Sequence, residues 1–171
     1  MISNIYWIED PKLRPKKMGT MARPRGNDWL EDEVMALKNS KIDCLISLLE
    51  RSEDWELGLE KEAELCQKWG IEFINFPIRD VYIPTDEEKF ISLAQKLADY
   101  LNKDKKLVIH CRMGIGRSSI LAAAIMISLA YEAKNVFEII SKYRKLKVPD
   151  TDEQRNWILS IEDRLKNHKS E

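Results

Sequence analysis

The chain has 171 residues, the size of about one domain and enough to bury a core without disulfides or metal ions. Hydrophobic residues make up 44% and charged residues 33%, which is typical of soluble globular proteins and excludes wholesale disorder. The 28 lysine and arginine residues nearly balance the 29 aspartate and glutamate residues, and the net charge of −1 argues against general nucleic-acid binding.

Neither a membrane span nor a signal peptide is expected. The longest uncharged run, residues 118–131, is shorter than the roughly 20 apolar residues that a spanning helix needs. The N-terminal sequence MISNIYWIED has no basic start and no long apolar stretch. The three cysteines are few and odd in number, which favours a reducing compartment, so we expect a cytoplasmic protein.

The first half of the chain alternates strand-like and helix-like patterns. Short runs of β-forming residues predict strands at residues 4–8, 18–22, 42–49 and 71–76, the first at a sheet edge and the last two buried. Helical periodicity predicts helices over 29–39 and 57–69. Asn27 or Asp28 could cap the first of these helices, and Gly70 closes the second.

The second half continues the alternation. Thr85 or Asp86 caps a helix with one apolar face, and a third buried strand is expected over 107–110. The almost wholly apolar segment 118–130 predicts a helix buried on all sides. Two more helices are expected at the C-terminal end, over 135–145 and 152–166. This order predicts an α/β fold with a mainly parallel central sheet flanked by helices, whose ligand binds at the carboxyl ends of the strands.

The loop that follows the third buried strand carries the chemistry. The segment HCRMGIGRSS, residues 110–119, runs from the end of that strand to the start of the apolar helix. Gly114 and Gly116 let the loop curl with its amides inward, which suits an anion of phosphate type. Arg117 can add a bidentate fork to two oxygens. The same positive field favours the thiolate form of Cys111, which we interpret as a nucleophile for phosphorus.

This segment resembles the HCxxGxGR(S/T) signature of the cysteine-dependent protein tyrosine phosphatase superfamily. The short chain resembles the compact dual-specificity branch, and the resemblance extends from about residue 18 to residue 158. Residues 76–84 resemble the mobile general-acid loop of these enzymes, with Asp80 at the acid position. The stretches 48–50 and 53–57 resemble the matching segment of kinase-associated and related prokaryotic phosphatases.

The resemblance implies a phosphotyrosine protein phosphatase-like fold, formed by a single dual-specificity-type phosphatase domain over residues 1–171. It implies that Cys111 forms a phosphocysteine, that Asp80 protonates the leaving oxygen, and that Ser118 aids breakdown of the intermediate. The residues that would bind the phosphate are Arg112, Met113, Gly114, Ile115, Gly116 and Arg117. No metal or other cofactor is expected, because the backbone and Arg117 supply the positive charge.

Three functions remain open from the sequence. The favoured substrate is a phosphorylated protein or peptide, carrying phosphotyrosine and also phosphoserine or phosphothreonine. The alternative is an inositol phosphate, a phosphoinositide or another small phosphomonoester. Arg112 is the only basic residue of the loop besides Arg117, and Met113 and Ile115 are apolar, which favours protein substrates. The third function is a phosphate-binding module without turnover.

Several other residues have more than one interpretation. Many tyrosine phosphatases carry a Gln-Thr-x-x-Gln element whose first glutamine positions water. Here Asp150 stands at that position and only Gln154 is kept, so N-capping of a helix by Asp150 or Thr151 is the favoured interpretation. His110 is expected to be a buried structural residue. Two cysteines are expected to be buried and inert, namely Cys44 and Cys66.

Arg23 and Arg25 flank a proline in a loop that lies near the active-site rim in related compact phosphatases. They either steer an anionic substrate or balance nearby carboxylates, namely Glu31, Asp32 and Glu33. The sequence does not decide the oligomeric state, for which a monomer is the simplest expectation.

Overall fold

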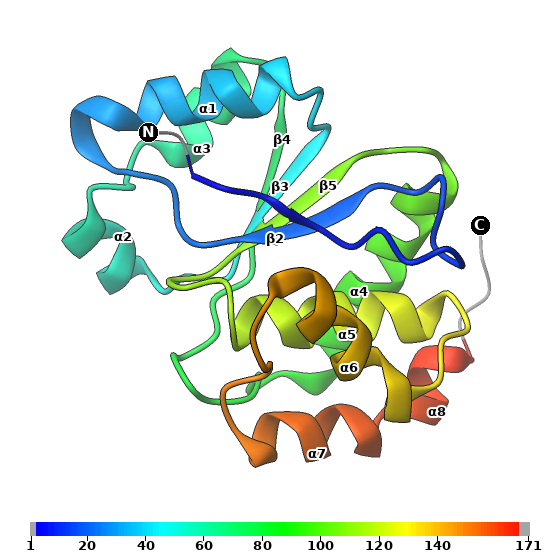
Figure 1. The fold of residues 1–171 in the computed structure, drawn as a ribbon. Helices are drawn as coiled ribbons and strands as arrows, with labels where there is room; N and C mark the ends of the chain where they lie inside the picture. The colour runs from blue at the N-terminus through cyan, green and yellow to red at the C-terminus, as the bar shows by residue number, and fades with distance from the viewer. Residues whose placement is uncertain (1–2, 168–171) are drawn as a thin grey trace.

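The computed structural model describes residues 3–167. Five strands form one sheet in the order β1-β2-β5-β3-β4 (Figure 1). β1 pairs antiparallel with β2, and every other pair of neighbours is parallel. The strands are β1 (Tyr6–Trp7), β2 (Met18–Met21), β3 (Cys44–Ser47), β4 (Glu72–Asn75) and β5 (Leu107–His110). This mainly parallel sheet confirms the predicted fold class.

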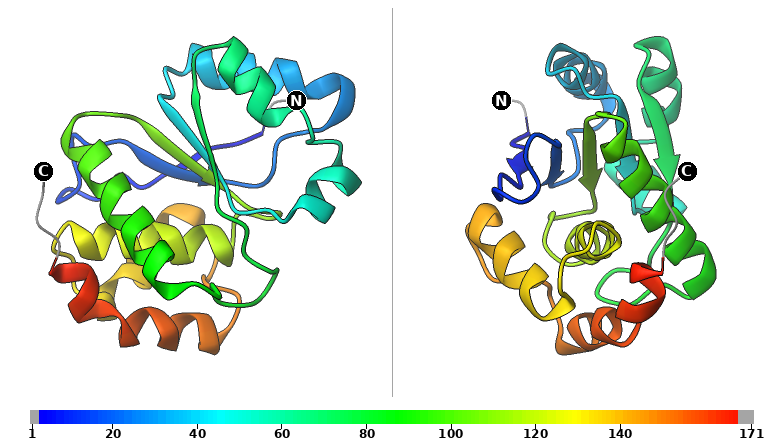
Figure 2. Two further views of the ribbon diagram at one scale, coloured as in Figure 1. Left: turned by 180° about the vertical axis from the view of Figure 1, so that it is seen from behind. Right: turned by 90° about the vertical axis from the view of Figure 1, so that its right-hand side faces the viewer.

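Helices cover both faces of the sheet (Figure 2). α1 (Leu30–Asn39), which follows the short 3₁₀ helix Asn27–Trp29, and α3 (Glu62–Lys68) lie on one face. On the other face lie α4 (Glu87–Asn102), α5 (Arg117–Ser128), α6 (Ala133–Arg144), α7 (Asp152–Ser160) and α8 (Glu162–Lys166). The short α2 (Arg51–Leu57) follows β3 at the carboxyl end of the sheet.

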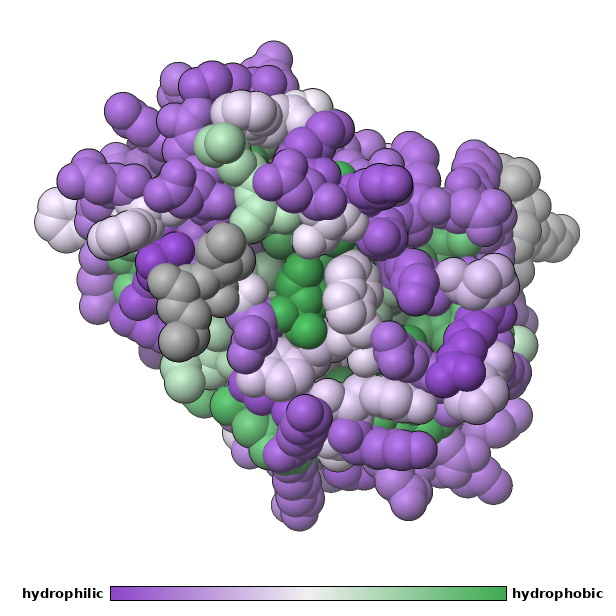
Figure 3. Space-filling view, turned by 45° about the horizontal axis from the view of Figure 1, so that its top comes forward, coloured by the Kyte–Doolittle hydropathy of each residue, from purple (hydrophilic) through white to green (hydrophobic). Residues whose placement is uncertain are grey.

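The strand pattern divides the core into two clusters, because successive side chains of a strand point to opposite faces. Leu45 and Val108 belong to the cluster with α1 and α3, whereas Ile46 and Ile109 belong to the larger cluster with α4 and α5. The residues of α5 from 117 to 127 are all buried, which confirms the helix expected to be buried on all sides. The face shown in Figure 3 is mostly hydrophilic, and its apolar residues form small areas among polar side chains.

The helix expected over 57–69 is correct only in its second half: α3 spans Glu62–Lys68 and is closed by Gly70 at φ +72°, whereas residues 58–61 are not helical. Gly58 has φ +70° and ends α2 in the left-handed conformation, so the chain turns before α3 begins. The sequence pattern did not predict α2, which lies almost entirely before the start of the expected helix at residue 57. The prediction of a buried strand over 71–76 also needs correction. β4 is an edge strand, and Glu72 and Asn75 at its two ends are exposed.

Helix boundaries differ from the prediction at two further places. Neither Asn27 nor Asp28 caps α1, because both lie in the 3₁₀ turn and the N-cap position is taken by Trp29. The helix expected over 152–166 is divided at Ile161 into α7 and α8. The N-cap of α4 is confirmed, since the Asp86 carboxylate accepts a hydrogen bond from the backbone N–H three residues later. Within residues 3–167 no helix is both long and apolar enough to cross a membrane.

Candidate active site

The phosphate loop, residues 111–116, connects β5 to α5 at the carboxyl end of the sheet. Cys111 is 3% exposed, and its Sγ accepts a hydrogen bond from the Gly114 N–H at 3.3 Å. Gly114 has φ +71°, and a Cβ there would lie 2.6 Å from the backbone carbon of Met21. Glycine is therefore required at this position both by the backbone conformation and by the close approach of β2.

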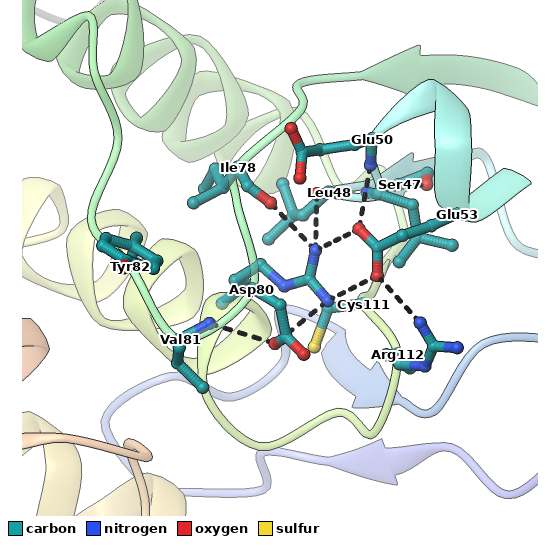
Figure 4. A network of polar contacts seen from close by, with 12 residues as sticks. Ser47, Leu48, Glu50, Glu53, Ile78, Asp80, Val81, Tyr82, Cys111 and Arg112 are labelled. Atoms are coloured by element: carbon teal, nitrogen blue, oxygen red, sulfur yellow. Dashed lines mark hydrogen bonds and ion pairs between the residues drawn. The ribbon is translucent and has the colours of Figure 1, made fainter.

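Arg117 begins α5, and its side chain is almost fully buried. Its guanidinium donates two hydrogen bonds to the Glu53 carboxylate, from Nη1 at 2.7 Å and from Nη2 at 3.0 Å, and a third to the Ile78 carbonyl at 2.8 Å (Figure 4). Burial by itself raises the pKa of Glu53, but the hydrogen bonds from Arg117 outweigh it and hold the pKa below its ordinary value. Glu53 thus stays ionised and fixes the orientation of the arginine.

Asp80 lies in the loop between β4 and α4 and reaches the same guanidinium. Its Oδ1 is 3.2 Å from Arg117 Nη2 and accepts the Val81 N–H at 3.0 Å (Figure 4). The Asp80 side chain is 52% exposed, so it borders both the solvent and the buried arginine. This is the placement that a proton donor to a leaving group requires.

Three polar atoms at the start of α5 are buried without a hydrogen-bond partner in the described part of the chain: Arg117 Nε, Ser118 Oγ and Ser119 Oγ. Buried groups of this kind are rare because leaving them unpaired costs free energy, and each one calls for an explanation such as a ligand. The structure thus brings Asp80 into contact with Arg117, which directly follows the loop that Cys111 begins, and Ser118 is the next residue of α5.

His110 is fully buried directly before Cys111 in the chain. Its Nε2 is 2.7 Å from Glu62 Oε2, and its Nδ1 is 3.3 Å from the Cys111 carbonyl oxygen. Burial lowers the pKa of His110, but the adjacent Glu62 carboxylate outweighs this and raises it above the ordinary value. The prediction of a buried structural histidine is confirmed. The other two cysteines are also buried as predicted, and burial raises the pKa of Cys44 and of Cys66 to about 12.

The remaining loop residues differ in their exposure and contacts. Arg112 lies at the mouth, where its Nη2 is 3.1 Å from Glu56 Oε1 and its Nη1 is 3.6 Å from a Glu53 carboxylate oxygen. Met113 is 59% exposed. Ile115 is half-buried and packs against the larger core cluster. A role of Arg112 in substrate binding thus competes with these two ion pairs and stays a prediction.

The segment before α7 closes another side of the loop. Thr151 caps α7, because its Oγ1 accepts the Gln154 N–H at 3.1 Å, and Gln154 Oε1 accepts the Asp150 N–H at 3.1 Å. N-capping is confirmed with Thr151 as the cap. The Asp150 carboxylate lies so close to the loop that a Cβ at Gly116 would be 2.1 Å from its Oδ2. Burial and the neighbouring Asp80 raise the pKa of Asp150.

The two N-terminal arginines are placed differently. Arg25 donates from its Nε to Glu33 Oε1 at 2.9 Å and stacks over Trp29 at 4.7 Å, so it balances a carboxylate as the second interpretation predicts. The Arg23 backbone N–H donates to the Arg112 carbonyl at 3.2 Å, which places Arg23 beside the phosphate loop. Its Nη1 donates to the Pro24 carbonyl.

Comparisons with known proteins agree with this geometry. A family model described as "Tc-R-P: Polymorphic toxin system, DSP-PTPase phosphatase" matches residues 19–130. The crystal structure of kinase associated phosphatase with its catalytic-site cysteine replaced by serine has a TM-score of 0.88, at 21% identity over 99% of both chains. The structure of Tk-PTP in the active form has a TM-score of 0.72, at 21% identity over 94% of this chain and 97% of that one.

Two curated relatives are more similar in sequence. Protein 067L of Invertebrate iridescent virus 3 is 27% identical over 135 residues, which cover 75% of this chain and 53% of the relative. Cyclin-dependent kinase inhibitor 3 of Rattus norvegicus is 25% identical over 138 residues, which cover 80% of this chain and 65% of the relative. The chain thus spans between half and two thirds of the length of these relatives.

Proposed function

Because the chain belongs to the Tc-R-P family of DSP-PTPase phosphatases, we propose that it is a cysteine-dependent protein phosphatase. The observation that carries this proposal is the meeting of Cys111, Arg117 and Asp80 at the carboxyl end of β5. A nucleophile, a buried cation and a half-exposed acid at one site are the parts that hydrolysis of a phosphate ester requires.

The first step transfers the phosphoryl group to the enzyme. The loop amides and Arg117 hold the nonbridging oxygens of the phosphate, and the Cys111 thiolate attacks phosphorus. The bond between phosphorus and the leaving oxygen breaks as the bond between sulfur and phosphorus forms. Asp80 gives its proton to the leaving oxygen, which departs as an alcohol or phenol.

The second step releases phosphate. The Asp80 carboxylate takes a proton from a water molecule, whose oxygen attacks phosphorus while the bond between phosphorus and sulfur breaks. Cys111 leaves as a thiolate, and the unpartnered hydroxyl of Ser118 can donate a hydrogen bond to it. The arginine and the loop amides stabilise the charge that develops in both steps.

The substrate of this proposal is a phosphorylated protein or peptide, with phosphotyrosine first and phosphoserine and phosphothreonine also accepted. The exposed rim residues Met113, Val81 and Tyr82 offer apolar contacts to a peptide. The Arg112 guanidinium, already paired with α2, adds little free positive charge for a polyanionic inositol phosphate. In this proposal the chain forms a single domain and is a monomer. A cytoplasmic location suits its three free cysteines.

Turnover of a synthetic aryl phosphate tests the activity, and a panel of phosphopeptides and inositol phosphates tests the substrate class. The wild type should release inorganic phosphate, and Cys111→Ser should fall to near background because a serine hydroxyl is not ionised at neutral pH. Cys66→Ser makes the same atomic change in α3 and should keep the activity. Turnover by the Cys111→Ser variant would exclude the covalent mechanism, and a preference for inositol phosphates would exclude the protein substrate.

A further inference from the structure

The carbonyl groups of the phosphate loop are held from outside the loop. The Cys111 carbonyl is contacted by the His110 ring at 3.3 Å, and the Arg112 carbonyl accepts the Arg23 backbone N–H at 3.2 Å. In a trans peptide the C=O and the following N–H point in opposite directions. Each outward carbonyl therefore turns the next amide toward the inside of the loop, where the phosphate would lie.

Arg144, the last residue of α6, holds the next two carbonyls. Its Nε donates to the Gly114 carbonyl at 2.9 Å, and its Nη2 donates to the Met113 carbonyl at 3.0 Å. The guanidinium is planar, so its two donors fix the two acceptors in one geometry. One side chain thus orients the peptides that carry the amides of Gly114 and Ile115.

Tyr6 in turn orients Arg144. The centre of the Tyr6 ring is 4.1 Å from Arg144 Cζ, a distance typical of a guanidinium stacked on an aromatic face. Tyr6 belongs to β1 and is held in register opposite Thr20 of β2. The N-terminal edge strand is therefore connected to the phosphate loop through one arginine, although the two are more than 100 residues apart in sequence.

We propose that Arg144, oriented by Tyr6, is a positioning residue for phosphate binding: it holds two peptide planes of the loop with their N–H groups turned toward the phosphate. This inference rests on the proposed function and deepens it. Arg144 touches no reacting atom in this scheme, and it acts only through the loop backbone.

The direct test measures the affinity for inorganic phosphate by calorimetry, alongside kcat and KM for an aryl phosphate. Arg144→Ala should weaken phosphate binding and lower kcat/KM by about tenfold or more, the effect of losing at least one hydrogen bond to a charged group. Arg144→Lys should restore the affinity only in part, because an ammonium lacks the planar fork. Tyr6→Leu should weaken phosphate binding by about two- to fivefold, the size of an exposed cation–π contact, whereas Tyr6→Phe should match the wild type.

Two matched controls separate positioning from stability. Arg14→Ala removes another arginine that donates to a backbone carbonyl, that of Glu9 at 3.1 Å, and should leave phosphate affinity unchanged. Tyr100→Leu removes another aromatic ring that contacts a cation, since Lys105 Nζ lies 4.2 Å from its centre near the amino end of β5. This variant should also keep the phosphate affinity of the wild type. If Arg144→Ala does not fold, the difference between Tyr6→Leu and Tyr6→Phe decides.

Phosphate affinity equal to that of the wild type in folded Arg144→Ala or Tyr6→Leu would overturn the inference. If the wild type binds phosphate and these variants do not, but the wild type hydrolyses no phosphate ester, the proposed function alone would be overturned. A wild type without phosphate binding would overturn both.

Discussion

Asp80 and Arg117 form an ion pair that joins the loop between β4 and α4 to the phosphate loop, and we propose that Asp80 is the general acid. A general acid must be protonated to act, so its loss of a proton at higher pH produces the basic limb of the kcat/KM profile. Asp80→Asn removes that proton, and the basic limb should flatten. For substrates with poor leaving groups, kcat should fall by about 10²- to 10⁴-fold.

The control for this change is Asp86→Asn, which alters the N-cap of α4 outside the reacting groups and should keep the basic limb. The measurement is a pH–rate profile with aryl phosphates of graded leaving-group acidity. An unchanged basic limb in Asp80→Asn would assign the acid to another residue, and Asp150, whose pKa is raised, would be the next to substitute.

Substitutions of Arg23 and Arg25 should have different effects, one on substrate binding and the other on stability. Arg25 is engaged by Glu33, so Arg25→Ala should lower the melting temperature and leave KM nearly unchanged. Arg23 lies beside the phosphate loop, so Arg23→Ala should raise KM for acidic phosphopeptides, with little effect on kcat or on an aryl phosphate. The rise in KM should shrink at high salt, because screening already weakens the wild-type contact. Equal KM values for wild type and Arg23→Ala at low salt would leave Arg23 a structural role.

At the scale of elements, the turn after α2 matters because this helix supplies Glu53 to Arg117. Gly58 ends α2 at φ +70°, and a Cβ there would meet the Asn27 side chain at 2.5 Å. Gly58→Ala should therefore lower the free energy of unfolding by about 1 kcal/mol or more, as measured by urea denaturation. Gly70 has φ +72° but meets only the flexible end of Lys38 at 3.3 Å, so Gly70→Ala should cost less. Equal losses would mean that the contact with Asn27 adds nothing to the backbone strain.

The turn after α2 also shows what the sequence pattern could not predict. The apolar spacing from residue 57 onward fits one helix, and only the left-handed glycine divides it. The phosphate loop itself could be predicted from the sequence, because Cys111, the two glycines and Arg117 lie close together in the chain. Three residues that contact this loop or its flanking residues from elsewhere were found only in the structure: Glu53, Glu62 and Arg144. The resemblance places Asp150 near the site, but the close approach of its carboxylate to Gly116 was found only in the structure. Glu53 had a partial signal, since it lies in a stretch that resembles related phosphatases, whereas Glu62 and Arg144 lie in ordinary helical patterns.

At the scale of the whole molecule, the site lies where three parallel strands end together. Met21 of β2 and Ser47 of β3 are the register partners of His110 at the end of β5. The helices that follow β3 and β5 place Glu53 and Arg117 above these ends. Arg117 is held by a helix that is buried in the larger core cluster, whereas Asp80 reaches the site from the loop between β4 and α4.

The buried pair of His110 and Glu62 connects the helix layer of α3 to the sheet directly beneath this loop. Glu62 raises the pKa of His110 in the folded protein, so the stabilisation is complete below the unfolded pKa of about 6.5 and is lost as the pH rises through the folded pKa. Glu62→Ala should lower the free energy of unfolding by about 3–5 kcal/mol near pH 6, and the difference from wild type should shrink toward pH 9. Glu132→Ala, which breaks an exposed pair with Lys166, should stay near the wild type at every pH. A difference between wild type and Glu62→Ala that stays constant from pH 6 to pH 9 would contradict the titration of His110 within this range.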